Sequence, residues 1–174
     1  MATCMAVLGT IVKTVGLKGE VKLLPRPDFW PGALEAEELE LVSDDTVRLR
    51  TGVEKFRTKG RTYILRLSGV GTIDEAETLV GLSLRVSLAG LGEAERPTDV
   101  LPCQVMGCSV ILPDGSVLGT VVDMLLGDVQ DCYIVENGNE RYLVPNVGEV
   151  VCNVDLDRKT IEIDPPEGLL DLRW

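Results

Sequence analysis

Histidine is absent from the 174-residue chain. Its absence excludes a Ser–His or Cys–His nucleophile pair, a histidine general base and a histidine-ligated metal. A metal-dependent hydrolase built on aspartates is the enzymatic alternative, but carboxylates such as Asp128 and Asp131 are scattered and form no cation-binding motif. The sequence therefore predicts no catalytic residue, no metal site and no cofactor, and favours a protein that binds over one that catalyses.

Aromatic residues and long apolar runs are scarce as well. Phe, Trp and Tyr make up 4% of the chain, which is poor material for a sheet that stacks unpaired bases. No apolar run approaches the roughly 20 residues that cross a bilayer, and the first residues do not resemble an export signal. The five cysteines are odd in number and form no CxxC pair, which predicts free thiols in a reducing cytoplasm. We expect a cytoplasmic protein without a membrane partner.

Positive charge is scarce in only one part of the chain. The net charge is −11, yet residues 1–92 hold 12 Lys and Arg against 12 Asp and Glu, whereas residues 93–174 hold 5 against 16. This asymmetry predicts two domains with different partners, at 1–92 and 100–174, joined by a Gly-, Glu- and Pro-rich linker at 93–99. An acidic domain attracts a basic protein and repels nucleic acid, although the acidity could also serve solubility alone.

Short strands account for most of the chain. Alternating or apolar runs bounded by turn residues predict strands at 5–12, 19–24, 39–42, 46–51, 54–58, 62–67 and 82–87 in the first half. One helix is predicted at 74–80, capped by Thr72. The second half is predicted to be all strand, at 105–112, 116–126, 132–136, 141–144, 150–154 and 160–163. The fold class is mainly β, and the first half fits a small β-barrel with one short helix.

Cations concentrate in one stretch of the first half. Lys55, Arg57, Lys59 and Arg61 alternate with uncharged residues, so a period of two would place all four on one face of a hairpin. Such a row suits the phosphates of folded RNA, while an ordinary solvated strand face is the alternative. Lys18 could extend the same patch, and Lys13 and Lys22 could do so too.

Several segments resemble the RimM family of bacterial ribosome maturation factors. The first is GTIVKT at 9–14, followed by GLKGEVKL at 16–23 and by GVGTIDEAETLVGLSLRV at 69–86. The second half adds DGSVLGTVVDML at 114–125, LVPNVGEVV at 143–151 and DPPEGLLDL at 164–172. These stretches follow the order of the family over nearly the whole chain.

The resemblance implies a translation-factor-like N-terminal β-barrel and a C-terminal PRC barrel in a monomeric, non-catalytic assembly factor. It also implies binding to ribosomal protein nineteen of the small subunit and to the immature subunit and its rRNA, whose head it helps to mature. Val100 and Leu101 stand where the family often has an aromatic pair implicated in ribosomal-protein binding. We therefore expect Val100, Leu101 and Pro102 to form the apolar centre of that interface, with core packing as the alternative. A translation-factor-like RNA-binding module without a ribosomal-protein partner is the alternative function.

Overall fold

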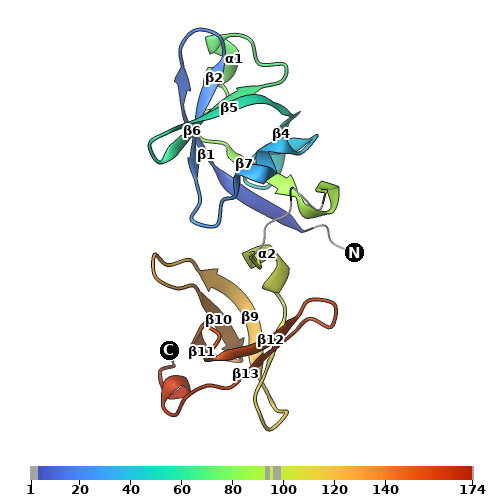
Figure 1. The fold of residues 1–174 in the computed structure, drawn as a ribbon, viewed down its shortest axis with the longest axis vertical. Helices are drawn as coiled ribbons and strands as arrows, with labels where there is room; N and C mark the ends of the chain where they lie inside the picture. The colour runs from blue at the N-terminus through green and yellow to red at the C-terminus, as the bar shows by residue number, and fades with distance from the viewer. Residues whose placement is uncertain (1–3, 93–94, 96–98, 174) are drawn as a thin grey trace. The chain divides into compact units, whose positions relative to one another are not determined.

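The computed structural model describes residues 4–92, 95 and 99–173. The chain divides into two compact units, residues 1–99 and 100–174, and each is built on a single sheet (Figure 1). The predicted linker at 93–99 lies outside the described residues except for 95 and 99. Within the described part, no helix is long and apolar enough to cross a membrane.

The first unit contains a seven-stranded antiparallel sheet. Its strands are β1 (Met5–Val15), β2 (Glu20–Pro25), β3 (Leu39–Ser43), β4 (Thr46–Thr51), β5 (Val53–Lys59), β6 (Thr62–Leu67) and β7 (Ser83–Ser87). They are ordered β4-β3-β7-β1-β2-β6-β5, so β4 and β5 form the two edges. All seven predicted strands are confirmed. The described residues of this unit also include the 3-10 turns η1 (Pro31–Glu35) and η2 (Leu88–Gly90).

Alternation along these strands separates a core side from a solvent side. On the core side of β1 and β2, Leu8, Ile11, Val21 and Leu23 are each fully buried. Successive side chains in a strand face opposite sides of the sheet. Glu20, Lys22 and Leu24, which alternate with Val21 and Leu23, therefore point away from the core. Most side chains on the other side are exposed, although Ile64 on β6, which shares that side with Lys22, is 1% exposed.

Helix α1 (Ile73–Glu77) begins where the sequence predicted. The Thr72 hydroxyl accepts the Glu75 backbone N–H at 3.2 Å, and the Glu75 carboxylate accepts the N–H groups of Thr72 and Gly71. These hydrogen bonds satisfy donors that the first turn leaves free and lower the pKa of Glu75. The predicted helix at 74–80 is confirmed in kind, but it ends at Glu77.

The second unit contains a six-stranded sheet. Its strands are β8 (Ser109–Ile111), β9 (Val117–Leu125), β10 (Cys132–Asn137), β11 (Glu140–Pro145), β12 (Val151–Asp155) and β13 (Thr160–Ile163). They are ordered β11-β10-β9-β8-β13-β12, and a 3-10 turn η4 (Leu169–Asp171) lies near the C-terminus. Neighbouring strands are antiparallel except β8 and β13, which pair in parallel. The second unit is thus also mainly β, as predicted.

The prediction that the second half is all strand is wrong at its start. Helix α2 (Pro102–Val105) occupies four residues there, and β8 begins only at Ser109. Pro102 suits a first helical position because its fixed φ is helical and its missing N–H needs no partner. The Gln104 side chain accepts the Leu101 N–H at 2.9 Å, and Gly107 follows with a φ of 80°. The predicted strand at 105–112 therefore loses its first half to a helical turn.

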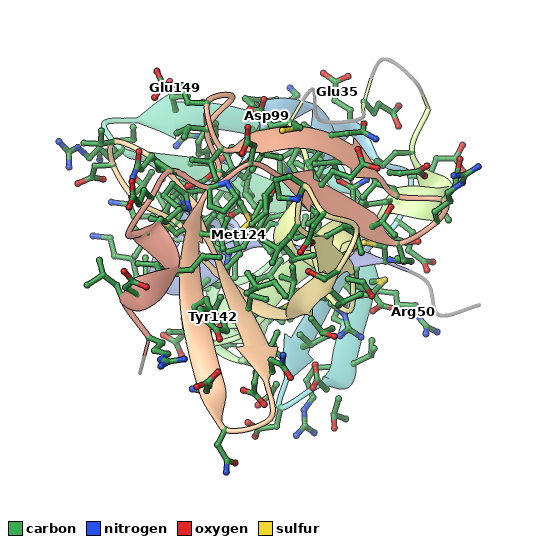
Figure 2. The ribbon with its side chains drawn as sticks, turned by 90° about the horizontal axis from the view of Figure 1, so that it is seen from below. Glu35, Arg50, Asp99, Met124, Tyr142 and Glu149 are labelled. Atoms are coloured by element: carbon green, nitrogen blue, oxygen red, sulfur yellow. The ribbon has the colours of Figure 1, made fainter. Side chains whose placement is uncertain are left out.

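The core of the second unit gathers around Tyr133, which is 1% exposed. Val121, Met124, Val135 and Tyr142 pack in the same cluster, and Met124 and Tyr142 are marked in Figure 2. Burial raises the pKa of Tyr133 to about 12, so this hydroxyl stays protonated at neutral pH. The inward-facing side chains of β9, β10 and β11 therefore form much of the core of this unit.

The cysteines only partly match the prediction of free thiols. The prediction is confirmed for Cys108, Cys132 and Cys152 and is wrong for Cys4 and Cys103, which are not free thiols. Burial raises the pKa of the Cys108 and Cys132 thiols. Since the thiolate is the reactive form, both are poorly suited to nucleophilic chemistry.

Candidate nucleic-acid and protein interfaces

Four adjacent strands of the first unit place cations on one side of the sheet. Lys13 on β1 is the Cα partner of Lys22 on β2, Lys22 is the partner of Ile64 on β6, and Ile64 is the partner of Arg57 on β5. Partners directly opposite each other point to the same side. The cations of this surface, which we call the basic face, are Lys13, Lys22, Lys55, Arg57, Lys59 and Arg66.

The row predicted from the sequence is only partly on this face. Lys55, Arg57 and Lys59 alternate along edge strand β5 and are exposed. Arg61 is not on the strand, because the hairpin turns at Gly60, whose φ is 62°, and Arg61. The prediction of a shared face is therefore right for three of the four cations and wrong for Arg61.

Arg57 is held by a carboxylate from another strand. Its guanidinium donates two hydrogen bonds to Glu20 on β2, at 2.8 and 3.2 Å, across the intervening strand β6. This bidentate pair lowers the pKa of Glu20, and the charges of Arg66 and Lys18 lower it further. Lys18 lies in the turn between β1 and β2 and is exposed. Glu20 is thus the counter-ion of Arg57, and its carboxylate also interacts electrostatically with Arg66 and Lys18.

Lysines on the same face have no such counter-ion. Within residues 4–92, no ion pair involves Lys13, Lys22 or Lys59. The pKa of Lys22 is lowered, first by desolvation and then by the charges of Lys13 and Lys59. Like charges directly opposite in a sheet destabilise it. A bound anion such as a phosphate would relieve this repulsion, so the three lysines are the part of the basic face best suited to RNA.

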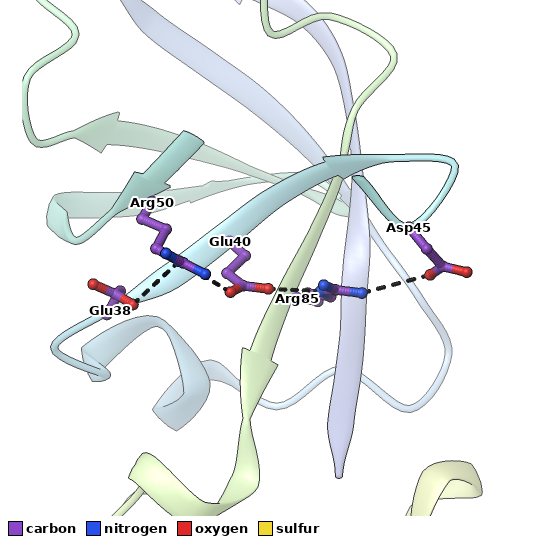
Figure 3. Close-up of polar contacts among 5 residues, drawn as sticks. All are labelled: Glu38, Glu40, Asp45, Arg50 and Arg85. Carbon is purple, nitrogen blue, oxygen red and sulfur yellow. Dashed lines mark hydrogen bonds and ion pairs between the residues drawn. The ribbon is translucent and has the colours of Figure 1, made fainter. Parts of the chain in front are cut away.

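Other cations of the first unit serve the fold. Arg50 on β4 contacts Glu38 and Glu40, and Glu40 also accepts a hydrogen bond from Arg85 on β7 at 2.9 Å, while Arg85 reaches Asp45 (Figure 3). Burial alone would raise the pKa of Glu40, but the hydrogen bonds from Arg85 and Arg50 lower it. This chain of ion pairs ties β3 to both of its neighbours and leaves Arg50 and Arg85 unsuited to docking.

The predicted protein-binding residues lie at the start of the second unit. Val100 is partly buried and packs against the core of that unit. Leu101 is 2% exposed, and Pro102 opens α2 and is partly exposed. Val100 and Pro102 retain some accessible surface, whereas Leu101 has almost none.

The second unit presents uncompensated negative charge. Residues 100–174 include 13 Asp and Glu against four Lys and Arg. Each of the four cations already has a partner inside the unit: Arg141 pairs with Glu136, Arg158 with Asp155 and Arg173 with Glu140, and Lys159 donates to the Gln104 carbonyl. The remaining carboxylates give the unit a field that attracts cations. Among the described residues, no three Cys, Asp or Glu side chains are grouped so as to hold a metal ion.

Two family models match this chain, one in each unit. Residues 6–89 match the RimM N-terminal domain, and residues 103–169 match the RimM PRC barrel domain. The solution structure of the N-terminal domain of RimM from Thermus thermophilus covers 52% of this chain and 96% of its own, at 22% identity and a TM-score of 0.42.

Two curated relatives are similar over nearly their full length. The ribosome maturation factor RimM of Staphylococcus epidermidis is 32% identical, covering 94% of this chain and 98% of the relative. The ribosome maturation factor RimM of Geobacillus kaustophilus is 33% identical, covering 94% of this chain and 95% of the relative. Because both domain families and these full-length relatives agree, the chain belongs to the RimM family.

Proposed function

We propose that this protein is a cytoplasmic, non-catalytic assembly factor that acts in the maturation of the small ribosomal subunit and its rRNA. The observation that carries the proposal is membership of the RimM family, whose curated relatives are named ribosome maturation factors. The absence of histidine supports a binding mechanism over catalysis.

The proposed partner of residues 100–174 is ribosomal protein nineteen of the small subunit. Ribosomal proteins that bind rRNA are strongly basic, and the excess carboxylates of this unit complement such a surface. In this proposal Val100, Leu101 and Pro102 contribute apolar contact, with Leu101 as a buried support for its two neighbours. Binding would mask the positive charge of the ribosomal protein from incorrect RNA sites.

The proposed ligand of residues 1–92 is the rRNA of the immature subunit, contacted through its phosphates. Lys55 and Lys59, together with Lys13 and Lys22, would supply direct contacts. Lys18 and Arg61, both in exposed turns at strand ends, would add to them. A phosphate entering near Arg57 would compete with Glu20 for its guanidinium.

The proposed mechanism is a shift of conformational equilibrium. A monomer that holds the ribosomal protein with one unit and immature RNA with the other favours the RNA conformation that suits both. Once the mature head makes its own contacts, the differential affinity disappears and the factor leaves. No bond chemistry is required.

Binding of the full chain to purified ribosomal protein nineteen tests this function. A fluorescence titration from low to high salt should give an affinity that falls markedly as salt rises, because screening weakens the attraction between opposite charges. Absent or salt-insensitive binding would contradict the protein-partner part. If the chain then still bound structured rRNA tightly, the function would instead be that of an RNA-binding module without a ribosomal-protein partner.

A further inference from the structure

Strands β9, β10 and β11 present an apolar surface on the side that faces away from their core. Leu125, Cys132 and Pro145 are partners in one row across the three strands, and Asp123, Ile134 and Leu143 are partners in the next row on the same side. The core side of the same strands holds Met124, Tyr133 and their neighbours. The outward residues therefore contribute little to the core. We call this surface the apolar outer face and define it by Val122, Leu125, Ile134 and Leu143.

A β-bulge in β9 enlarges this surface. The register shifts between Ile134 and Val135, whose partners are Asp123 and Val121, so Val122 has no partner. As a result Val122 and Asp123 are both exposed, although neighbours in a regular strand point to opposite sides. The bulge thus sets an exposed valine directly beside an exposed carboxylate.

Two of the four side chains that define this surface, Val122 and Leu125, are exposed, whereas Ile134 and Leu143 are half-buried. Val122 is 40% exposed and Leu125 is 48% exposed, and Val129 in the loop after β9 is 96% exposed. A grouped set of exposed aliphatic side chains differs from the isolated ones that any soluble protein carries, and it is typical of an interaction site.

Carboxylates lie within and around the apolar outer face, where Asp123 stands directly opposite Ile134. Asp123 and Glu136 lie on the same three strands, and Asp128 and Asp131 lie in the loop that joins β9 to β10. Glu136 and Arg141 pair at 2.9 Å, and both line an open hollow with Ile134, Gly138 and Asn139. Arg141 is the one cation of these three strands, and its charge is already compensated.

We propose that the apolar outer face is the main docking surface for the basic ribosomal protein, in addition to the contact that Val100 and Pro102 contribute, an inference that rests on the proposed function. The apolar side chains supply desolvated contact, and the carboxylates among and around them orient a cationic partner. RNA is disfavoured because its phosphates would meet Asp123, Asp128 and Asp131. A second copy of this chain is disfavoured because it would bring the same carboxylates against them.

The test is a titration of ribosomal protein nineteen against four full-length proteins. These are the unchanged chain, the double variant Val122→Ser/Leu125→Ser, the double variant Val100→Ser/Pro102→Ser and the control Val117→Ser. Val117 is 56% exposed on β9 but lies outside the rows that pair with β10. Thermal unfolding followed by circular dichroism checks that the exposed substitutions leave the fold intact.

We expect Val122→Ser/Leu125→Ser to weaken binding by at least about tenfold, since two central contacts are truncated, and Val117→Ser to bind like the unchanged chain. Unchanged affinity of the Val122/Leu125 variant, with the unchanged chain still binding, would overturn this docking surface and leave the proposed function standing. If only the Val100→Ser/Pro102→Ser variant lost affinity for ribosomal protein nineteen, the apolar outer face would likewise be overturned as the main docking surface. Absence of binding by the unchanged chain would overturn the proposed partner and this surface together.

Discussion

Arg57 and Glu20 form a bidentate ion pair on the basic face, with donor–acceptor distances of 2.8 and 3.2 Å. The pair spans from β5 to β2 over the whole width of β6. A carboxylate in this position satisfies the same guanidinium donors that a phosphate would use. In the proposed contact with rRNA, Glu20 would therefore weaken the attraction for phosphate while it holds Arg57 in place.

Removing the charge of Glu20 should strengthen RNA binding. Glu20→Gln frees Arg57 from its counter-ion, and the affinity of the full chain for a structured fragment of small-subunit rRNA should rise several-fold. The slope of log affinity against log salt should steepen by about 0.7–0.9 if one further phosphate is engaged. Glu77→Gln on the exposed side of α1 is the matched control, because it removes one negative charge outside the basic face. Equal gains for both variants would mean that Glu20 acts only through net charge.

Removing lysines from the face should have the opposite effect. The double variant Lys22→Gln/Lys59→Gln should bind the same RNA about tenfold more weakly, with a salt slope shallower by about 1.5 if each lysine meets one phosphate. Its midpoint of thermal unfolding should not fall, because Lys22 is repelled by Lys13 and Lys59 in the free protein. The control is Arg48→Gln on β4, because β4 is the edge strand farthest from β5 in the order of the sheet. Unchanged RNA affinity of the double variant would assign the row to an ordinary solvated strand face.

Acid should weaken the first unit through Glu40. The folded pKa of Glu40 lies below its ordinary value, so this carboxylate contributes stability above that value and loses the contribution as pH falls through the folded pKa. Glu40→Gln should cost about 1–3 kcal/mol at pH 7, because the charge-assisted bonds to Arg85 and Arg50 weaken. The variant should also lose part of the pH dependence. Urea unfolding followed by Trp30 fluorescence in a Trp174→Phe background, at pH 7 and pH 4, measures both effects. An equal free-energy difference between variant and parent at the two pH values would contradict this role.

A close backbone approach in the second unit predicts a selective loss of stability. A Cβ at Gly119 would lie 2.9 Å from the Glu136 carbonyl carbon on β10, so Gly119→Ala must push β9 and β10 apart. The expected cost is about 1–3 kcal/mol in the free energy of unfolding. Gly148→Ala is the control, since nothing lies within 4 Å of its added Cβ. Urea denaturation compares the two, and equal midpoints would show that the sheet accommodates the methyl group.

Much of the fold follows from local sequence signals. Asp44 and Asp45 separate two predicted strands, and Gly138 separates two more; these residue types tolerate positive φ, and all three have it in the structure. Helix α2 was missed because four residues give no measurable periodicity, and only Pro102 and Gly107 mark its ends. The parallel pairing of β8 with β13 was also missed, because no local pattern encodes a contact between segments about 50 residues apart.

The sequence predicts which cations share a strand, but it does not predict which residues of other strands lie beside them. Alternation located Lys55, Arg57 and Lys59, yet the counter-ion Glu20 lies 37 residues from Arg57 and becomes a neighbour only through the order β2-β6-β5. The apolar outer face is marked by the consecutive exposed pair Val122 and Asp123 in β9, a strand whose alternation is also broken by the buried pair Leu118 and Gly119. A bulge could explain the exposed pair, but only the register of β9 against β10 identifies it.

Association with immature small subunits tests the central claim most directly. Cell extract is sedimented through a sucrose gradient, and the chain is detected in each fraction together with precursor and mature small-subunit rRNA. The protein should co-sediment with particles that carry precursor rRNA and be absent from mature subunits, and Lys22→Gln/Lys59→Gln should move it towards the top of the gradient. Equal occupancy of immature and mature subunits, or sedimentation as free protein only, would contradict the account.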